Sequence, residues 1–196
     1  MEIMDGKKYL LYLLLLTALL QAETGLGLNI NHEDVEVSGE INMNTFTGYY
    51  GTTTFMLGGS YLYAGDNDRE NREHLMTLSV SGQNSLQNIE GLSAGLGIKA
   101  VFADNYIALP LCMRVAYALP LIDTIPTTSL FAKFAYAPSV LTFSDGETYR
   151  EYRLGVDMEL FPSTHIFAGY RNIDTDYDDE SYNFNDSFYG GLKLTF

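Results

Sequence analysis

Apolar residues occupy every second position between residues 107 and 119, and this alternation is the feature that most limits the fold. The apolar side chains are Ile107, Leu109, Leu111, Met113, Val115, Tyr117 and Leu119. Successive side chains of a β-strand point to opposite faces, so a strand gathers this set on one face, whereas a helix spreads it around its surface. The segment is also longer than an ordinary globular strand of about 5–6 residues. It therefore predicts a long β-strand.

The same period recurs along most of the chain and predicts an all-β protein. Ten strands are favoured, and eight are possible, because the first hairpin and the segment at 76–80 carry the weakest alternation. The candidate strands are 26–30, 35–43, 55–63, 76–80, 92–102, 107–119, 130–136, 152–160, 166–170 and 188–196. There is no internal repeat, linker or low-complexity tract to indicate a second domain.

Residues 1–22 are organised like a secretory signal peptide. Lys7 and Lys8 precede an apolar run that ends at Gln21-Ala22. The run is too short for a membrane helix, which needs about 20 apolar residues. We predict a signal peptide at 1–22, cleaved near Ala22, and one β-barrel domain at 23–196. A retained anchor is the alternative, because Leu20 departs from the small-residue rule for cleavage sites.

The composition excludes several classes of protein. A hydrophobic content of 46% is too high for a disordered chain. The 11 basic residues against 25 acidic ones cannot supply a phosphate-binding surface for nucleic acid. The single cysteine, Cys112, excludes an intramolecular disulfide and a cysteine-based zinc site.

Charged residues inside the candidate strands mostly take the phase opposite the apolar stripe. The set assigned to the interior is Lys99, Arg114, Lys133, Arg153, Arg171, Lys193, Glu36, Glu40, Glu151, Asp157 and Glu159. A soluble β-sandwich or lipocalin-like barrel shows the same pattern with its charged phase in water. The signal peptide, the long strands and the aromatic last residue favour the inverse arrangement, in which the apolar phase faces lipid.

The C-terminal segment alternates up to its last residue. Phe188, Leu192, Leu194 and Phe196 share one face, which is the pattern that the outer-membrane assembly machinery recognises. Polar, mostly acidic segments at 64–73, 144–149 and 172–187 fall on one rim, and short turns at 121–126 and 161–164 fall on the other. This asymmetry is typical of a transmembrane barrel. We therefore predict a small antiparallel up-and-down transmembrane β-barrel in the bacterial outer membrane.

Short motifs along the mature chain resemble the YfaZ-type outer-membrane protein family. They are Gly27-Leu-Asn-Ile-Asn31, Tyr136-Ala-Pro138, Leu141-Thr-Phe143, Tyr149-Arg-Glu-Tyr152, Gly169-Tyr-Arg-Asn-Ile173 and Gly191-Leu-Lys-Leu-Thr-Phe196. The resemblance implies a small Gram-negative outer-membrane barrel and supplies no catalytic residues.

Barrel size limits the function. Side chains can largely fill an interior of eight to ten strands, and unpaired charges there cost several kcal/mol each, so the interior charges are expected to form ion pairs. We predict a structural barrel, or a narrow pore for ions and small solutes, in contact with outer-membrane lipid and lipopolysaccharide and without a cofactor. A surface interaction protein that uses its acidic loops is the alternative.

An enzyme that modifies lipid A acyl chains is the least favoured class. It would need histidine beside a nucleophile or carboxylates near the outer leaflet. The histidines are His32, His74 and His165, and no His-x-Ser motif occurs. We therefore predict no enzymatic activity.

An acidic segment is a weak candidate for a cation site. Asp174, Asp176 and Asp178 resemble the start of a calcium loop, but the later positions depart from the pattern. A solvated loop is favoured, with loose bridging of Ca²⁺ or Mg²⁺ to lipopolysaccharide phosphates as the alternative. Cys112 is expected to be a packed free thiol on the lumen face.

Overall fold

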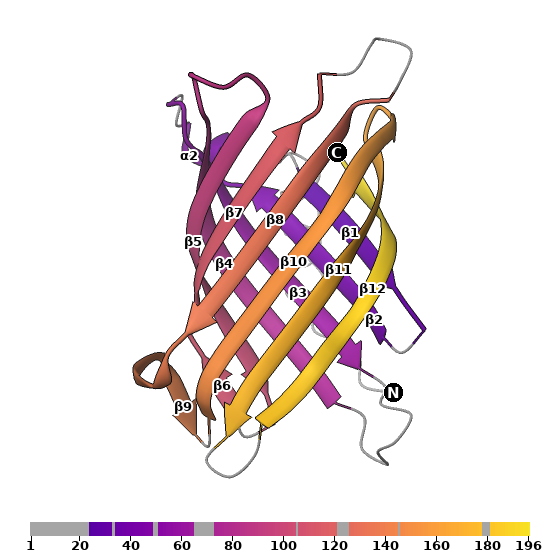
Figure 1. The fold of residues 1–196 in the computed structure, drawn as a ribbon. Coiled ribbons are helices and arrows are strands. Elements are labelled where there is room, and N and C mark those ends of the chain that lie inside the picture. The colour runs from indigo at the N-terminus through magenta and orange to yellow at the C-terminus, as the bar shows by residue number, and fades with distance from the viewer. Residues whose placement is uncertain are drawn as a thin grey trace, which may run out of the picture.

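The computed structural model describes residues 24–32, 34–48, 51–64, 73–104, 106–120, 126–144, 146–177 and 181–196. These residues form an antiparallel ten-stranded β-barrel (Figure 1). The all-β fold and the favoured number of strands are thereby confirmed. The predicted signal peptide at 1–22 lies outside the described residues. No helix in the described part of the chain is long and apolar enough to span a membrane.

The strands follow one another around the barrel in chain order. They are β1 (Thr24–Ile30), β2 (Asp34–Asn42), β3 (Thr54–Ala64), β4 (Glu73–Ser85), β5 (Leu92–Ala103), β7 (Leu111–Ala118), β8 (Thr128–Ala137), β10 (Gly146–Phe161), β11 (Thr164–Tyr177) and β12 (Ser181–Thr195). The short elements are α2 (Asn44–Thr47), β6 (Tyr106–Ala108), the 3-10 turn η1 (Ser139–Leu141) and β9 (Thr142–Ser144).

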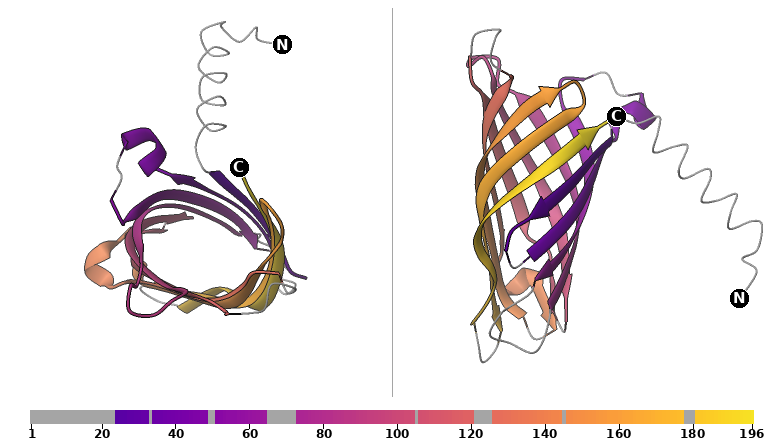
Figure 2. Two further views of the ribbon diagram at one scale, coloured as in Figure 1. Left: turned by 90° about the horizontal axis from the view of Figure 1, so that it is seen from above. Right: turned by 90° about the vertical axis from the view of Figure 1, so that its right-hand side faces the viewer.

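Pairing of the first and last strands closes the barrel (Figure 2). Leu26 of β1 stands opposite Leu194 of β12, and β4 pairs with β5 on the far side. The start of β1 and the end of β12 therefore lie at one rim, which we call the termini rim. The opposite rim carries the β6–β9 pair (Figure 1), and we call it the β6–β9 rim.

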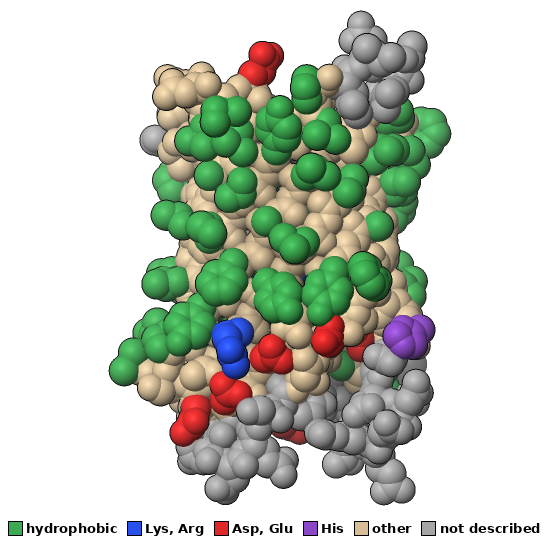
Figure 3. Space-filling model, viewed as in Figure 1, with side chains coloured by type: hydrophobic (Ala, Val, Ile, Leu, Met, Phe, Trp, Pro, Cys, Tyr) green, Lys and Arg blue, Asp and Glu red, His purple; other side chains and the backbone are tan. Residues whose placement is uncertain are grey.

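The outward phase of the strands is apolar over most of the barrel height. Leu96 is 70% exposed and Ile98 is 57% exposed, although both lie in the middle of β5. Figure 3 shows hydrophobic side chains covering this face, with charged side chains below them towards the β6–β9 rim. The rings of Tyr152, Tyr170 and Phe188 form a row across β10, β11 and β12, in which the centroids are 5.9 Å apart for the first pair and 5.5 Å apart for the second.

Two sequence predictions about element boundaries are wrong. The expected strand at 107–119 is divided into β6 and β7, because Pro110 has no backbone N–H to donate to the ladder. β6 pairs with β9, whereas β7 pairs with β8.

The expected acidic loop at 172–187 is mostly strand, since β11 continues to Tyr177 and β12 starts at Ser181. The expected loop at 144–149 is also largely replaced by the start of β10. Polar side chains pair across this extension: Asn183 donates to Asp174, and Thr148 donates to Asp176. Apolar alternation does not reveal these strand segments, because their outward residues are polar.

Two neighbouring glycines of β12 are expected to differ sharply in their tolerance of a side chain. A Cβ on Gly191 would overlap the carbonyl oxygen of Leu28 and the ring of Phe167, whereas the nearest atom to a Cβ on Gly190 is the carbonyl oxygen of Phe167 at 3.7 Å. Overpacking of this kind costs about 1–3 kcal/mol. Gly191→Ala should therefore lower the unfolding free energy by that amount in a denaturant titration, and Gly190→Ala should leave it nearly unchanged. Equal effects would contradict the close approach at Gly191.

Candidate functional site: the barrel lumen

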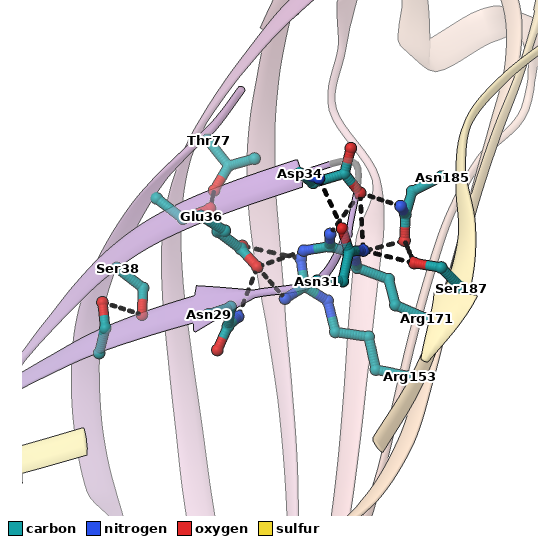
Figure 4. Close-up of polar contacts among 12 residues, drawn as sticks. Asn29, Asn31, Asp34, Glu36, Ser38, Thr77, Arg153, Arg171, Asn185 and Ser187 are labelled. Atoms are coloured by element: carbon teal, nitrogen blue, oxygen red, sulfur yellow. Dashed lines mark hydrogen bonds and ion pairs between the residues drawn. The ribbon is translucent and has the colours of Figure 1, made fainter. Parts of the chain in front are cut away.

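A neutral cluster of ion pairs crosses the lumen. We call it the lumen ion network, and its members are Asp34, Glu36, Lys99, Glu151, Arg153 and Arg171 (Figure 4 shows most of them). Strands β2, β5, β10 and β11 supply these side chains, all in the inward phase. The network holds three carboxylates and three cations, so its charges balance.

Glu36 is the centre of the lumen ion network. The guanidinium of Arg153 donates to both of its carboxylate oxygens at 2.8 and 3.0 Å, and Arg171 donates to Oε2 at 2.5 Å. Asn29 also donates to Oε2 at 2.7 Å. Glu36 and Arg171 are each only 1% exposed. A carboxylate so deeply buried is stable because charged donors surround it.

The other members extend the network towards β5 and β12. Arg153 Nε donates to Glu151 at 2.6 Å, and Lys99 pairs with the same carboxylate. Arg171 donates to Asp34 Oδ2 at 3.2 Å and to the amide oxygen of Asn185 at 2.9 Å. Asp34 is missing from the interior charges predicted from the sequence, because the candidate strand starts at residue 35, whereas β2 starts at Asp34. The feature that could have identified Asp34 is its position two residues before Glu36, because residues two apart in a strand share one face.

The remaining predicted lumen charges lie closer to the termini rim. Glu40 pairs with Lys193, and Oδ1 of Asp157 accepts a hydrogen bond from Nδ1 of His165 at 2.8 Å. Glu159 stands opposite His165 in the register, and no described residue forms an ion pair with it. Arg114 and Lys133 are neighbours across β7 and β8, and neither forms an ion pair with any described carboxylate.

Inward-facing apolar residues gather inside the barrel near the β6–β9 rim. This apolar plug consists of Leu62, Leu75, Val101, Tyr106, Ala108, Ala135, Ala137, Tyr149, Ile173 and Phe184. Its members are at most 4% exposed. The hydroxyl of Tyr149 donates to Glu151 at 2.8 Å, so the plug packs directly on the lumen ion network. Sequence reasoning missed the plug because it assigned the apolar residues to the outer face, although Leu62 and Ile173 lie in the inward phase.

A cavity of about 470 Å³ occupies the lumen on the other side of the network. Its wall differs from one side to the other. Strands β1–β5 contribute mainly glycine, serine and threonine, including Gly27, Ser60 and Ser79. Strands β7–β12 contribute the longer side chains, and Cys112, Arg114 and Lys133 line this side. The small residues of β1–β5 leave the cavity unfilled, and the long basic residues of β7–β12 face it.

The weak cation candidate is not assembled as a loop. Asp174 and Asp176 lie in β11 and accept hydrogen bonds from Asn183 and Thr148. Asp178 lies outside the described residues. Within the described ranges, no group of three or more His, Cys, Asp or Glu side chains is placed to hold a metal ion.

Comparison with known proteins adds one decisive finding. A family model described as YfaZ precursor matches residues 10–196. The chain belongs to the YfaZ precursor family. No curated protein and no solved structure matches it. The word precursor in the family description fits the predicted signal peptide, and the YfaZ-type resemblance inferred from the motifs is confirmed.

Proposed function

We propose that this YfaZ-family chain is an outer-membrane barrel of a Gram-negative bacterium, with a structural role and a lumen through which solutes do not pass. The outward apolar face supports the membrane location. Soluble monomers rarely expose an apolar patch larger than about 300–600 Å², whereas here exposed large hydrophobic side chains occur on all ten barrel strands. Lipid is the partner that removes such a surface from water.

The observation that carries the closed lumen is the stacking of the apolar plug on the lumen ion network. Tyr106 and Tyr149 have no exposed surface, and the network beneath them holds paired charges without a net excess. An ion passing through would have to displace both layers. This arrangement favours a structural barrel over the narrow pore, which is the alternative.

The C-terminal strand supports assembly in the outer membrane. Phe188 is 79% exposed and Phe196 is 58% exposed, and Leu192 and Leu194 share their outward phase. These four side chains form the predicted signal for the barrel assembly machinery. Outer-membrane lipid and lipopolysaccharide are the proposed partners of the outer face, and the proposal includes no catalytic activity.

Two measurements test this function. Unboiled protein from purified outer membranes should migrate faster in SDS gels than boiled protein, because a closed barrel resists unfolding by detergent. In planar bilayers the folded protein should give no current steps above the background of protein-free bilayers. Regular small steps would establish the narrow pore instead, and recovery of the protein as a detergent-independent periplasmic monomer would overturn the membrane location.

A further inference from the structure

We propose that the lumen cavity is a binding site for a small oxyanion, a solute that carries a phosphate or carboxylate group, held by Arg114 and Lys133 and entering from the termini rim. This inference goes beyond the structural role and requires only the folded barrel.

The first observation is a row of four basic side chains across neighbouring strands. The register places Arg114 opposite Lys133, Lys133 opposite Arg153, and Arg153 opposite Arg171. Side chains directly opposite each other have Cβ atoms about 4.5–5.5 Å apart, and like charges there are destabilising. Such a row needs negative charge to balance it.

The second observation is that carboxylates pair with only two of the four basic side chains in this row. Glu36, Glu151 and Asp34 neutralise Arg153 and Arg171 of this row, together with Lys99. No carboxylate of the described residues lies within 4 Å of the cationic groups of Arg114 or Lys133, and Lys133 instead lies over the ring of Phe131 at 5.7 Å. Glu40 is the carboxylate whose charge acts on both residues, but it forms its ion pair with Lys193. Neither Arg114 nor Lys133 therefore has a salt-bridge partner among the described residues.

The third observation is the space in front of these two residues. Lys133 is exposed although its side chain points into the barrel, and Arg114 is half-buried. The cavity of about 470 Å³ lies within the range of about 300–1,000 Å³ found for small-molecule sites. The hydroxyls of Ser60 and Thr77, which hydrogen-bond each other, and of Ser79 line the cavity on β3 and β4 and can hydrogen-bond a polar ligand.

Access is expected from the termini rim. The apolar plug and the lumen ion network lie between the cavity and the β6–β9 rim. The cavity lining reaches Gly25, the second residue of β1, and His165, the second residue of β11, both close to the termini rim. A barrel in the outer membrane with its termini in the periplasm would therefore take its ligand from the periplasm.

Cys112 provides a local probe. It lines the cavity two residues from Arg114, and it is the only cysteine of the chain. Its thiolate attacks a methanethiosulfonate reagent, forms a mixed disulfide and releases methanesulfinate. The experiment compares the rates for an anionic reagent with a sulfonate group and a cationic reagent with a trimethylammonium group, using the folded barrel in neutral detergent. The ratio of the two rates cancels the thiolate fraction, which any change of nearby charge alters.

The ratio of the anionic rate to the cationic rate should be about tenfold or more higher for Cys112 than for 2-mercaptoethanol, a small free thiol. The reason is that a charged cleft concentrates counter-ions by at least that factor. The double substitution Arg114→Gln and Lys133→Gln should bring the ratio close to that of 2-mercaptoethanol. Arg150→Gln is the matched control, because Arg150 is exposed and lies outside the cavity lining, and it should leave the ratio unchanged. Inorganic phosphate should slow the anionic reagent more than potassium chloride of equal ionic strength.

Several results would overturn the proposal: no labelling by either reagent, a ratio near that of 2-mercaptoethanol, a ratio that the double substitution leaves intact, or equal effects of phosphate and chloride. Heat-dependent migration in SDS gels verifies that each variant is folded, and the two single substitutions replace the double one if it does not fold. Because the test uses detergent-folded protein, its failure would leave the membrane location and the closed lumen untouched.

Discussion

Glu36→Gln is expected to lower the unfolding free energy of the barrel by about 3–5 kcal/mol, the usual cost of removing one partner from a buried ion pair. Glu36 accepts hydrogen bonds from both Arg153 and Arg171 and is 1% exposed. Glutamine keeps the shape but removes the charge, and the two guanidinium groups would then share the carboxylates of Asp34 and Glu151 alone. A urea or guanidinium titration of the barrel in lipid vesicles measures the loss.

Glu40→Gln is the matched control for this prediction. Glu40 lies on the same strand, β2, in the same inward phase, and it forms its ion pair with Lys193 alone. Both side chains of that pair are more than a quarter exposed, so its loss should cost about 1 kcal/mol or less. If the two substitutions cost the same, the lumen ion network does not depend on Glu36 in the way that its contacts indicate.

Val156→Arg is expected to destabilise the barrel by about 2–4 kcal/mol in lipid, the cost of an arginine at the bilayer midplane on the lipid face of a barrel. Val156 is 40% exposed on the outward face of β10 and lies midway between Tyr152 and Leu160, which share its phase. The same denaturant titration in vesicles measures the change.

The loss of unfolding free energy caused by an arginine should depend on how deep the substituted residue lies in the bilayer. Phe161 ends β10 at the termini rim and is 68% exposed, so Phe161→Arg should cost about 0–1 kcal/mol, as near the membrane interface. If Val156→Arg were as harmless as Phe161→Arg, the outward face would not contact hydrocarbon, and the proposed membrane location would be wrong.

The strands could be predicted where one phase is apolar and the other is not. Leu92, Leu96 and Ile98 alternate with small or polar neighbours, and they lie in β5 as expected. The extension of β11 through Asp174 and Asp176 could not be predicted in this way, because its outward residues are polar and resemble a loop. Side chains across the ladder, not the local sequence, stabilise that part of the strand.

The partners of the lumen charges could not be predicted either. Arg153 binds Glu36, which lies 117 residues away in the chain, and Arg171 binds Asp34, which lies 137 residues away. Alternation indicates that these residues share the interior, but the register between β12 and β1 and the shape of the closed barrel decide which of them meet.

The sequence by itself determined the all-β class, the face of each strand that is apolar and the ionic character of the interior, and it favoured ten strands over eight. These follow from the two-residue period, which is a local property of the chain. Only the tertiary structure decided that the apolar plug gathers at one rim, that Glu36 joins two arginines, and that Arg114 and Lys133 line the cavity. Those features depend on distances between residues far apart in the chain, which the closure of the barrel fixes.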